Sequence, residues 1–409
     1  MRKYIALLLI LSILLFSLTG CYDARSLESL SYVVAIGLDK GNNNLLRLSL
    51  QFASPSSDSG SNSKSSSQFS STTVTTIECN SIDSGINLIN SYISNQVNLS
   101  HAKVIVISEA LATEGIADYI STFINNVEVR PDCNIIVSRS SAEDFLNNSK
   151  PTLETLSARY YEQVLSSTTY TGYTENVSLS DFYAALKSPV TQPVAILGGL
   201  NSSSTHDTSS TTPYIEADSS HEAGTTPIQD KTSLENTGLA VFDADKLVGE
   251  LNAIESICHL ICSNKFEGSV ISIPSPFDQN GIIDISVSKK FSTKREVKLV
   301  NGTPYITCNV YLNASVSSMG ANIDVSSTEN LNLISKYANS FLKQKITDYL
   351  YKTSKELHCD IDSFGSELYS DYLTVSDFEK VDWLNIYKDS YFDVNVAVSI
   401  RGSYLVIKD

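Results

Sequence analysis

The sequence predicts an α+β protein with three mixed α/β domains, the last of which packs antiparallel strands on one long helix. Three observations support this fold class. Strand-like and helix-like runs alternate along the first half of the chain, apolar and polar residues alternate at 305–316, and an amphipathic stretch covers residues 328–357. Because 409 residues exceed what one hydrophobic core usually holds, we expect more than one domain.

The chain begins with a pattern typical of a secretory signal. Arg2 and Lys3 precede an apolar run at residues 5–18, which is too short to span a membrane comfortably. The run ends in Leu18-Thr19-Gly20-Cys21, an ending similar to a bacterial lipobox, in which the cysteine thiol receives a diacylglycerol and cleavage precedes the cysteine. We therefore expect a lipoprotein signal peptide at residues 1–20 and lipidation at Cys21. The alternative is an ordinary signal peptide with a chance cysteine.

Charge and hydropathy limit how the mature chain meets its surroundings. The formal net charge is −16, and loss of Arg2 and Lys3 with the signal peptide makes it −18. An anionic leaflet repels an acidic body, so we expect the lipid to provide the membrane attachment. The same charge argues against nucleic acid as a partner. No later segment reaches 18 consecutive apolar residues, so the sequence predicts no second membrane anchor.

The first domain is predicted at residues 21–199. Its strands are expected at 33–38, 46–52, 74–79, 101–108 and 133–138, and its helices at 82–93, 109–126, 141–146, 152–165 and 180–186. Ser81 is expected to cap the first of these helices. Residues 54–73 consist largely of Ser, Thr, Gly, Asn and Asp. Such a run cannot bury enough apolar surface to offset its ordering entropy, so we expect a mobile loop.

Two further domains are predicted after a second Ser/Thr-rich stretch at 200–232, which we interpret as a linker or a long surface loop. The small middle domain spans 233–295, and the C-terminal domain spans 296–409. Their strands are expected at 237–242, 269–273, 282–288, 305–316 and 392–400, and their helices at 247–262 and 328–357.

Metal sites are not expected, and the sequence leaves open whether the remaining cysteines form disulfides. Six cysteines remain beside the lipobox, and because most lie in apolar runs we expect buried free thiols. They are Cys79, Cys133, Cys258, Cys262, Cys308 and Cys359. Cys258-His259-x-x-Cys262 lacks a second ligand pair, which argues against a zinc site. Asp360-Ile361-Asp362 and Glu356 form an acidic patch without EF-hand spacing, and we interpret it as a solvated turn and not a calcium site.

Signatures of catalysis are also missing from the sequence. It contains no phosphate-binding G-x-x-x-x-G-K-[ST], no dinucleotide-binding G-x-G-x-x-G after a strand, no H-E-x-x-H and no G-x-S-x-G. With serine so abundant, chance groupings of Ser, His and Asp carry no weight as a triad. We therefore expect a protein that is not an enzyme and has no cofactor.

Several short motifs follow one another along the mature chain. They are Gly20-Cys21-Tyr22-Asp23, Val34–Lys40, His101–Glu109, Gly115-Ile116, Glu128-Val129-Arg130, Thr237–Phe242, Lys246–Gly249, Asp360–Gly365 and Val394–Gly402. Together they resemble the spore germination lipoprotein family of the Ger(x)C type, the C subunits of nutrient germinant receptors in endospore-forming bacteria. The sequence departs from the family pattern at Tyr22 (usually tryptophan), at Asp362-Ser363 (Phe-Gly) and in its two Ser/Thr-rich insertions.

The resemblance implies a lipid-anchored, three-domain subunit on the outer, extracytoplasmic face of the spore inner membrane. It implies assembly with two integral membrane subunits, of the A and B types, into a receptor that triggers germination in response to nutrients. It implies no catalysed reaction, and it leaves open whether this subunit itself binds a germinant.

Two other functions compete with this interpretation. The first is an extracytoplasmic solute-binding lipoprotein of a transporter, a class that needs two similar α/β lobes with a cleft between them. The predicted C-terminal domain, with strands and one long helix, does not repeat the first domain. The second is a lipid-anchored hydrolase, which is disfavoured because no nucleophile, base and orienting group can be named.

Overall fold

The computed structural model describes residues 1–17, 27–53, 72–149, 157–166, 168–201, 221–226, 234–278, 281–319 and 327–401. Cys21, most of the loop predicted at 54–73 and most of the stretch at 200–232 lie outside the described residues. The apolar run of the expected signal peptide forms the helix α1 (Arg2–Ser17). None of the helices in the described part of the chain combines the length and the apolar character that a membrane span requires.

The larger of the two sheets in the described residues has nine strands, in the order β3-β2-β1-β5-β6-β7-β8-β9, with β4 beside β1. These strands are β1 (Leu30–Lys40), β2 (Leu46–Phe52), β3 (Thr73–Cys79), β4 (Gln96–Asn98), β5 (Val104–Ser108), β6 (Asn134–Ser138), β7 (Val194–Leu200), β8 (Leu234–Asp243) and β9 (Lys246–Leu251). Neighbouring strands from β1 through β7 run parallel, and both ends of the sheet are antiparallel. Both faces of the central strands are buried, which explains their continuous apolar sequences.

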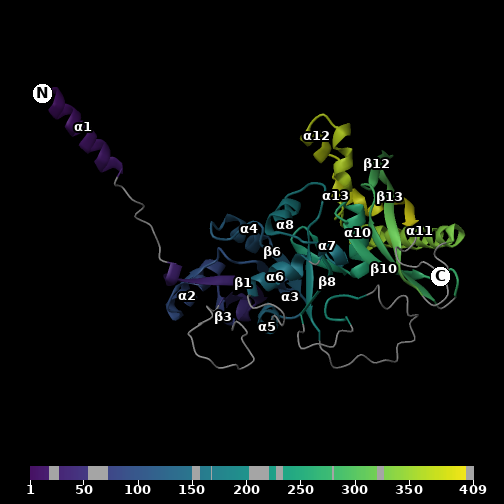
Figure 1. Cartoon of the computed structure of the whole chain (residues 1–409), viewed down its shortest axis with the longest axis horizontal. Coiled ribbons are helices and arrows are strands. Elements are labelled where there is room, and N and C mark those ends of the chain that lie inside the picture. Colours follow the sequence, from purple (N-terminus) through teal and green to yellow (C-terminus); the bar gives the residue numbers. More distant parts are fainter. Residues whose placement is uncertain are drawn as a thin grey trace, which may run out of the picture.

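Helices cover both faces of this first sheet (Figure 1). They are α2 (Ile82–Tyr92), α3 (Glu109–Glu114), α4 (Ala117–Asn125), α5 (Ala142–Asn148), α6 (Ser157–Ser166) and α8 (Leu179–Leu186). The short helix α7 (Thr168–Thr171) contacts β10 (Gly268–Pro274), a strand of the second sheet. Phe145 of α5 and Tyr161 of α6 pack in one cluster with Val106 of β5. The predicted cap of α2 is confirmed, because the Ser81 hydroxyl accepts a hydrogen bond from the Ser84 backbone.

The second sheet comprises β10 (Gly268–Pro274), β11 (Ile282–Lys289), β12 (Lys294–Val300), β13 (Thr303–Met319) and β14 (Tyr391–Arg401). The long strand β13 organises it. One edge of β13 pairs antiparallel with β12 along its first half and with β11 along its second half. β14 pairs with residues 305–315 of β13, which span both halves, so it lies on the opposite edge. This last pairing is parallel.

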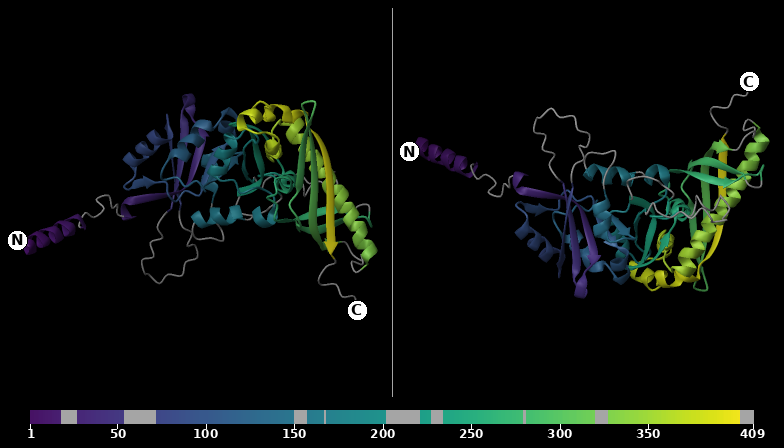
Figure 2. Two further views of the ribbon diagram at one scale, coloured as in Figure 1. Left: turned by 90° about the horizontal axis from the view of Figure 1, so that it is seen from above. Right: turned by 90° about the horizontal axis from the view of Figure 1, so that it is seen from below.

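Two helices pack between and against the sheets. α11 (Thr328–Tyr351) runs along β14 and buries Ile334, Ala338 and Leu342 in the core that the second sheet shares. Figure 2 shows this helix lying along the length of the second sheet. α10 (Ala253–Cys262) contacts β8 of the first sheet as well as α11 and β13. Nine of its residues are buried, which fits a helix that is apolar on nearly all sides and lies between two layers.

The predicted α+β fold class is confirmed, as are the alternating strand at 305–316 and the long helix, which continues from α11 through a π-helical turn at Lys352–Glu356. Two predicted helices were wrong in part. Residues 247–251 belong to strand β9, and the helix begins only after Asn252, whose side chain caps it. The helix predicted at 109–126 is two helices, because Gly115 has φ +123° and ends the first.

The domain boundaries placed at 199/200, 232/233 and 295/296 remain a prediction. The sheets show how the predicted middle domain is distributed: β8 and β9 pair within the first sheet, whereas β10 and β11 pair within the second. Strands β4, β7 and β12 were not predicted. β7 contains Gly198 and Gly199, and a glycine pair in a sequence favours a turn. In the structure Gly198 lies so close to Ile136 and Phe145 that a larger residue would not fit there.

Candidate functional site

A buried cluster of charged and polar side chains joins three distant parts of the chain. We call it the ionic junction, and it comprises Glu175, His259, Lys265, Tyr349 and Asp362. Glu175 precedes α8, which covers the first sheet, while His259 lies on α10. Tyr349 lies near the end of α11, and Asp362 follows that helix. The junction therefore holds α10 to elements from both sides.

His259 is the centre of the ionic junction. Its Nε2 lies 2.7 Å from Oε2 of Glu175, and its Nδ1 lies 3.0 Å from Oδ1 of Asp362. The Tyr349 hydroxyl donates to the other oxygen of Asp362 at 2.8 Å. Lys265 pairs with the second oxygen of Glu175. His259 is fully buried, and both of its ring nitrogens have hydrogen-bond partners within the protein.

The titration of this cluster follows from its geometry. Burial by itself lowers the pKa of His259, but the hydrogen bonds and charges of Asp362 and Glu175 outweigh it and raise that pKa to about 9. Burial raises the pKa of Glu175, yet its contacts with His259 and Lys265 bring it down to about 2. At neutral pH the histidine is therefore an imidazolium that donates to two carboxylates.

Asp360 lies beside the junction and is also buried. Its Oδ2 accepts hydrogen bonds from the indole Nε1 of Trp383 at 2.7 Å and from the Gly365 backbone at 3.0 Å. Burial and the nearby charge of Asp362 raise the pKa of Asp360 to about 7. The interpretation of Asp360-Ile361-Asp362 as a solvated turn was therefore wrong. Both carboxylates are internal because α13 (Trp383–Ile386) and α10 enclose them.

The ionic junction has no route for a substrate to reach His259 or Asp362, because both side chains are fully buried. It therefore serves to hold elements together and not to carry out acid–base chemistry on an external molecule. The neighbouring cysteines Cys258 and Cys262 are buried free thiols, as are the other four cysteines of the described residues. The predicted burial is confirmed. Within the described ranges, no group of His, Cys, Asp or Glu side chains has a metal-binding arrangement.

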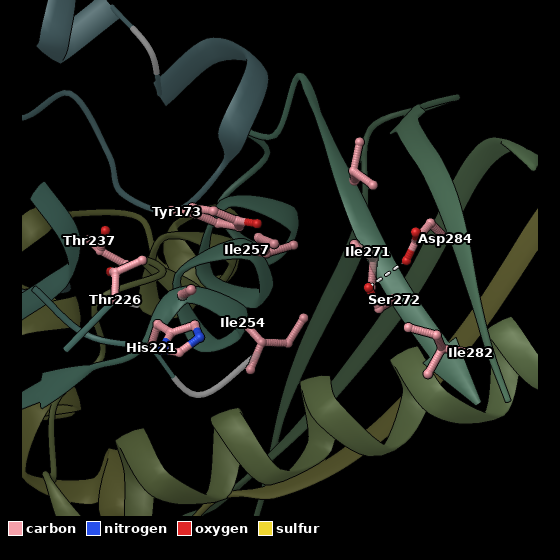
Figure 3. Close-up of a pocket in the computed structure, with 12 residues that line it drawn as sticks. Tyr173, His221, Thr226, Thr237, Ile254, Ile257, Ile271, Ser272, Ile282 and Asp284 are labelled. Carbon is pink, nitrogen blue, oxygen red and sulfur yellow. Dashed lines mark hydrogen bonds between the residues drawn. The ribbon is translucent and has the colours of Figure 1, made fainter. Parts of the chain in front are cut away.

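A groove of about 390 Å³ opens between the two sheets (Figure 3). The first wall comes from Tyr173, segment 221–226, β8 and α10, and the second from β10 and β11. Its lining residues are Tyr173, His221, Thr226, Thr237, Ala253, Ile254, Ile257, Val270, Ile271, Ser272, Ile282 and Asp284. Ile254 and Ile257 lie near the middle of the view, with Thr226, Thr237 and His221 to their left and Ile271, Ser272, Ile282 and Asp284 to their right.

Polar groups of the groove are incompletely paired. The Ser272 hydroxyl donates to Oδ1 of Asp284 at 2.6 Å, and among the described residues no Lys or Arg pairs with this carboxylate. On the other wall, the buried Oγ1 of Thr226 has no hydrogen-bond partner within the part of the chain that the structure describes. Buried polar atoms are normally satisfied, so the groove has unused binding capacity.

The sequence offered only weak signals for these two sites. His259 was considered as a zinc ligand with Cys258 and Cys262, whereas its partners in the structure are Glu175 and Asp362, 84 and 103 residues away. The acidic residues Asp360 and Asp362 were noticed in the sequence. That both carboxylates are buried could not be predicted, because it depends on how distant segments pack around them. Asp284 and Thr226 were not singled out. The predicted lipidation residue Cys21 lies outside the described residues, so the structure brings it to neither site.

Comparison with known proteins places the chain in a family. The family described as "Spore germination protein N-terminal domain" matches residues 23–198. The family described as "Spore germination B3/GerAC like, C-terminal" matches residues 237–404. Together the two matches span most of the chain. They flank the stretch at 200–232 that was predicted as a linker or loop.

Two curated relatives come from Bacillus subtilis (strain 168). Spore germination protein KC is 24% identical over 377 residues, which cover 90% of this chain and 87% of that protein. YfkR, also described as a spore germination protein, is 22% identical over 393 residues, which cover 96% and 94%. The crystal structure of the GerBC protein matches 89% of this chain and 96% of its own, at 17% identity and a TM-score of 0.48. The chain belongs to the Ger(x)C family, the C subunits of germinant receptors.

Proposed function

We propose that this protein is the lipid-anchored C subunit of a spore germinant receptor and that it is needed for nutrient-triggered germination. It is held by lipid on Cys21 at the outer face of the spore inner membrane. There it assembles with two integral membrane subunits, of the A and B types. The observation that carries the proposal is the pair of family matches at residues 23–198 and 237–404, which together cover both sheets.

Features of the chain support membrane attachment through lipid. The lipobox-like Leu18-Thr19-Gly20-Cys21 follows the apolar helix α1 and precedes the first family match by two residues. The mature chain carries a net negative charge, which gives it no electrostatic attraction to an anionic leaflet. Two or three acyl chains anchor a protein stably, at about 0.8 kcal/mol for each buried CH₂ group.

We further propose that the subunit acts without catalysing a reaction. The ionic junction is closed to substrates, because His259 and Asp362 are buried. In the groove, Ser272 and Asp284 are hydrogen-bonded, but no third residue is seen to orient them as in a catalytic triad among the described residues. The protein would contribute to the receptor through binding and assembly.

Replacement of Cys21 tests the anchor and the function together. Spores of a Cys21→Ala strain, and of a strain without the gene, are exposed to nutrients and, separately, to calcium dipicolinate. The nutrient response should be lost or strongly reduced in both strains, whereas germination by calcium dipicolinate should stay largely intact. Fractionation should show that the altered protein leaves the membrane fraction.

A Ser26→Ala strain provides the matched control, since it changes a residue near the same terminus but keeps the thiol. It should germinate normally and keep the protein in the membrane fraction. Normal nutrient germination of the deletion strain, in a background without sister receptors, would refute the proposed function. Membrane attachment of the Cys21→Ala protein would refute the lipid anchor alone.

A further inference from the structure

We propose that the groove between the two sheets binds a small organic ammonium ion with an apolar body. The geometry that supports this proposal is a carboxylate without a cation at one wall, a patch of aliphatic side chains, and the unsatisfied hydroxyl of Thr226 at the other wall (Figure 3). The inference adds a binding activity to the proposed receptor subunit and does not depend on the lipid anchor.

The size of the groove suits a small molecule. Its volume of about 390 Å³ lies near the lower end of the range of about 300–1,000 Å³ that is typical of ligand pockets.

Aliphatic side chains determine the middle of the ligand. Ile254 and Ile257 extend from α10, and Ile271 and Ile282 extend from β10 and β11. Val270 adds to them at the rim, where 52% of its surface is exposed. Ile254, Ile257 and Ile271 are at most 6% exposed and form the floor, so a ligand that covers the patch removes apolar surface from water mainly at Val270 and the half-buried Ile282, at about 25 cal/mol for each Å². The ligand therefore has an uncharged, branched or aromatic body.

Asp284 determines the charge of the ligand. One of its oxygens accepts from Ser272, and this hydrogen bond fixes the orientation of the carboxylate. Its other oxygen has no partner among the described residues, and no basic side chain of the groove neutralises it. An ammonium group is the complementary partner, because a charge-assisted hydrogen bond to a carboxylate is stronger than a neutral one.

The opposite wall determines the second polar contact. The hydroxyl groups of Thr226 and Thr237 lie there with the imidazole of His221, and the Thr226 oxygen is both buried and unpaired. A carbonyl or carboxylate oxygen on the ligand could accept from these groups. The expected ligand thus carries an ammonium at one end, an apolar body, and a hydrogen-bond acceptor at the other end.

A pair of probes separates charge from shape. L-leucinamide carries an ammonium and a branched apolar body, the two features that Asp284 and the aliphatic side chains would contact, whereas N-acetyl-L-leucinamide lacks the charge. Binding of each to the full chain in detergent micelles is measured by calorimetry. We expect L-leucinamide to bind and the acetylated probe to bind about tenfold more weakly or less, since a hydrogen bond to a charged group is lost.

Three variants locate the binding. Asp284→Asn keeps the hydrogen bond from Ser272 but removes the charge, and it should weaken L-leucinamide binding about tenfold. Val270→Trp adds bulk at an exposed rim position and should weaken it similarly. Asp393→Asn is the control, because Asp393 is an exposed carboxylate on β14 outside the groove and should leave affinity unchanged. Circular dichroism checks that each variant is folded.

The proposal is overturned if neither probe binds, if both bind equally, or if Asp284→Asn and Val270→Trp bind L-leucinamide as the unaltered chain does. An extended peptide pairing with the edge of β10 is the competing occupant. Equal affinity for both probes, which share a peptide-like carbonyl, would favour that occupant and reject the ammonium site.

Discussion

The ionic junction and the groove lie between elements of the same two sheets, yet their charged groups have opposite environments. In the junction, the carboxylates of Glu175 and Asp362 both contact His259, which is removed from solvent. In the groove, Asp284 has a hydroxyl partner but no cation among the described residues. Buried charge is tolerated only where it is paired, so the first region is suited to hold the elements together and the second to bind something else.

Loss of the central charge of the junction should have the largest effect. We expect His259→Gln to lower the free energy of unfolding by about 3–5 kcal/mol, because Asp362 then remains buried without a cation and Glu175 keeps only Lys265. Urea unfolding of the full chain, followed by fluorescence, measures the change.

The matched control in the groove is Asp284→Asn, for which we expect a change within about 0.5 kcal/mol, as for an ordinary surface substitution. A cost as large as that of His259→Gln would mean that the groove carries structural charge, and the contrast between the two regions would then fail.

Dependence of stability on pH should reveal the junction in the unaltered protein. The pKa of His259 is about 9 when folded, against 6.5 for the free side chain, so the folded state binds more protons in this interval. The free energy of unfolding should therefore fall by about 3 kcal/mol as the pH rises from 6.5 to 9. Glu175 acts in the opposite direction, because its pKa is about 2 when folded against 4.5 for the free side chain. Its contribution to stability is lost as the pH falls from 4.5 to about 2.

Asp360 adds to the decline at intermediate pH. Its pKa of about 7 exceeds the ordinary 3.8, so the folded state again binds more protons and loses stability as the pH rises between these values. The measurement is urea unfolding at a series of pH values. In His259→Gln the fall between pH 6.5 and 9 should disappear, and its persistence would assign the proton to another group.

A smaller effect is expected from packing beside the junction. A Cβ atom at Gly365 would lie 2.5 Å from Cδ1 of the Trp383 indole, which is buried and bonded to Asp360. We expect Gly365→Ala to cost about 1–3 kcal/mol, because a well-packed ring has little room to move. Thermal unfolding compares the variant with the unaltered chain.

Gly249→Ala is the matched control for this substitution. The new Cβ would lie 2.5 Å from Cδ2 of Leu357, the far end of a flexible and partly exposed side chain. It should cost less than Gly365→Ala because that side chain can move aside. Equal costs would show that the rigidity of Trp383 is not what distinguishes the junction.

Local pattern was enough to predict many of the elements. The alternation at 305–316 predicted β13, and the apolar run at 33–38 predicted β1, because side-chain periodicity reports directly on which faces are buried. Pattern failed at 247–251, where a short apolar segment fits a strand or a helix equally well. It also gave no indication that β14 pairs parallel with β13, since pairing direction depends on how α11 returns the chain.

Both sites depend on contacts between distant segments. The α+β class, the long helix and the motifs that resemble the Ger(x)C family could be recognised from the sequence, because each depends on residues close together along the chain. The burial of Asp362 against His259, and the position of Asp284 at a groove without a cation among the described residues, depend on how the fold brings distant segments together. The same carboxylate group is a structural ion or a binding group according to which side chains the fold places around it, and sequence spacing does not contain that information.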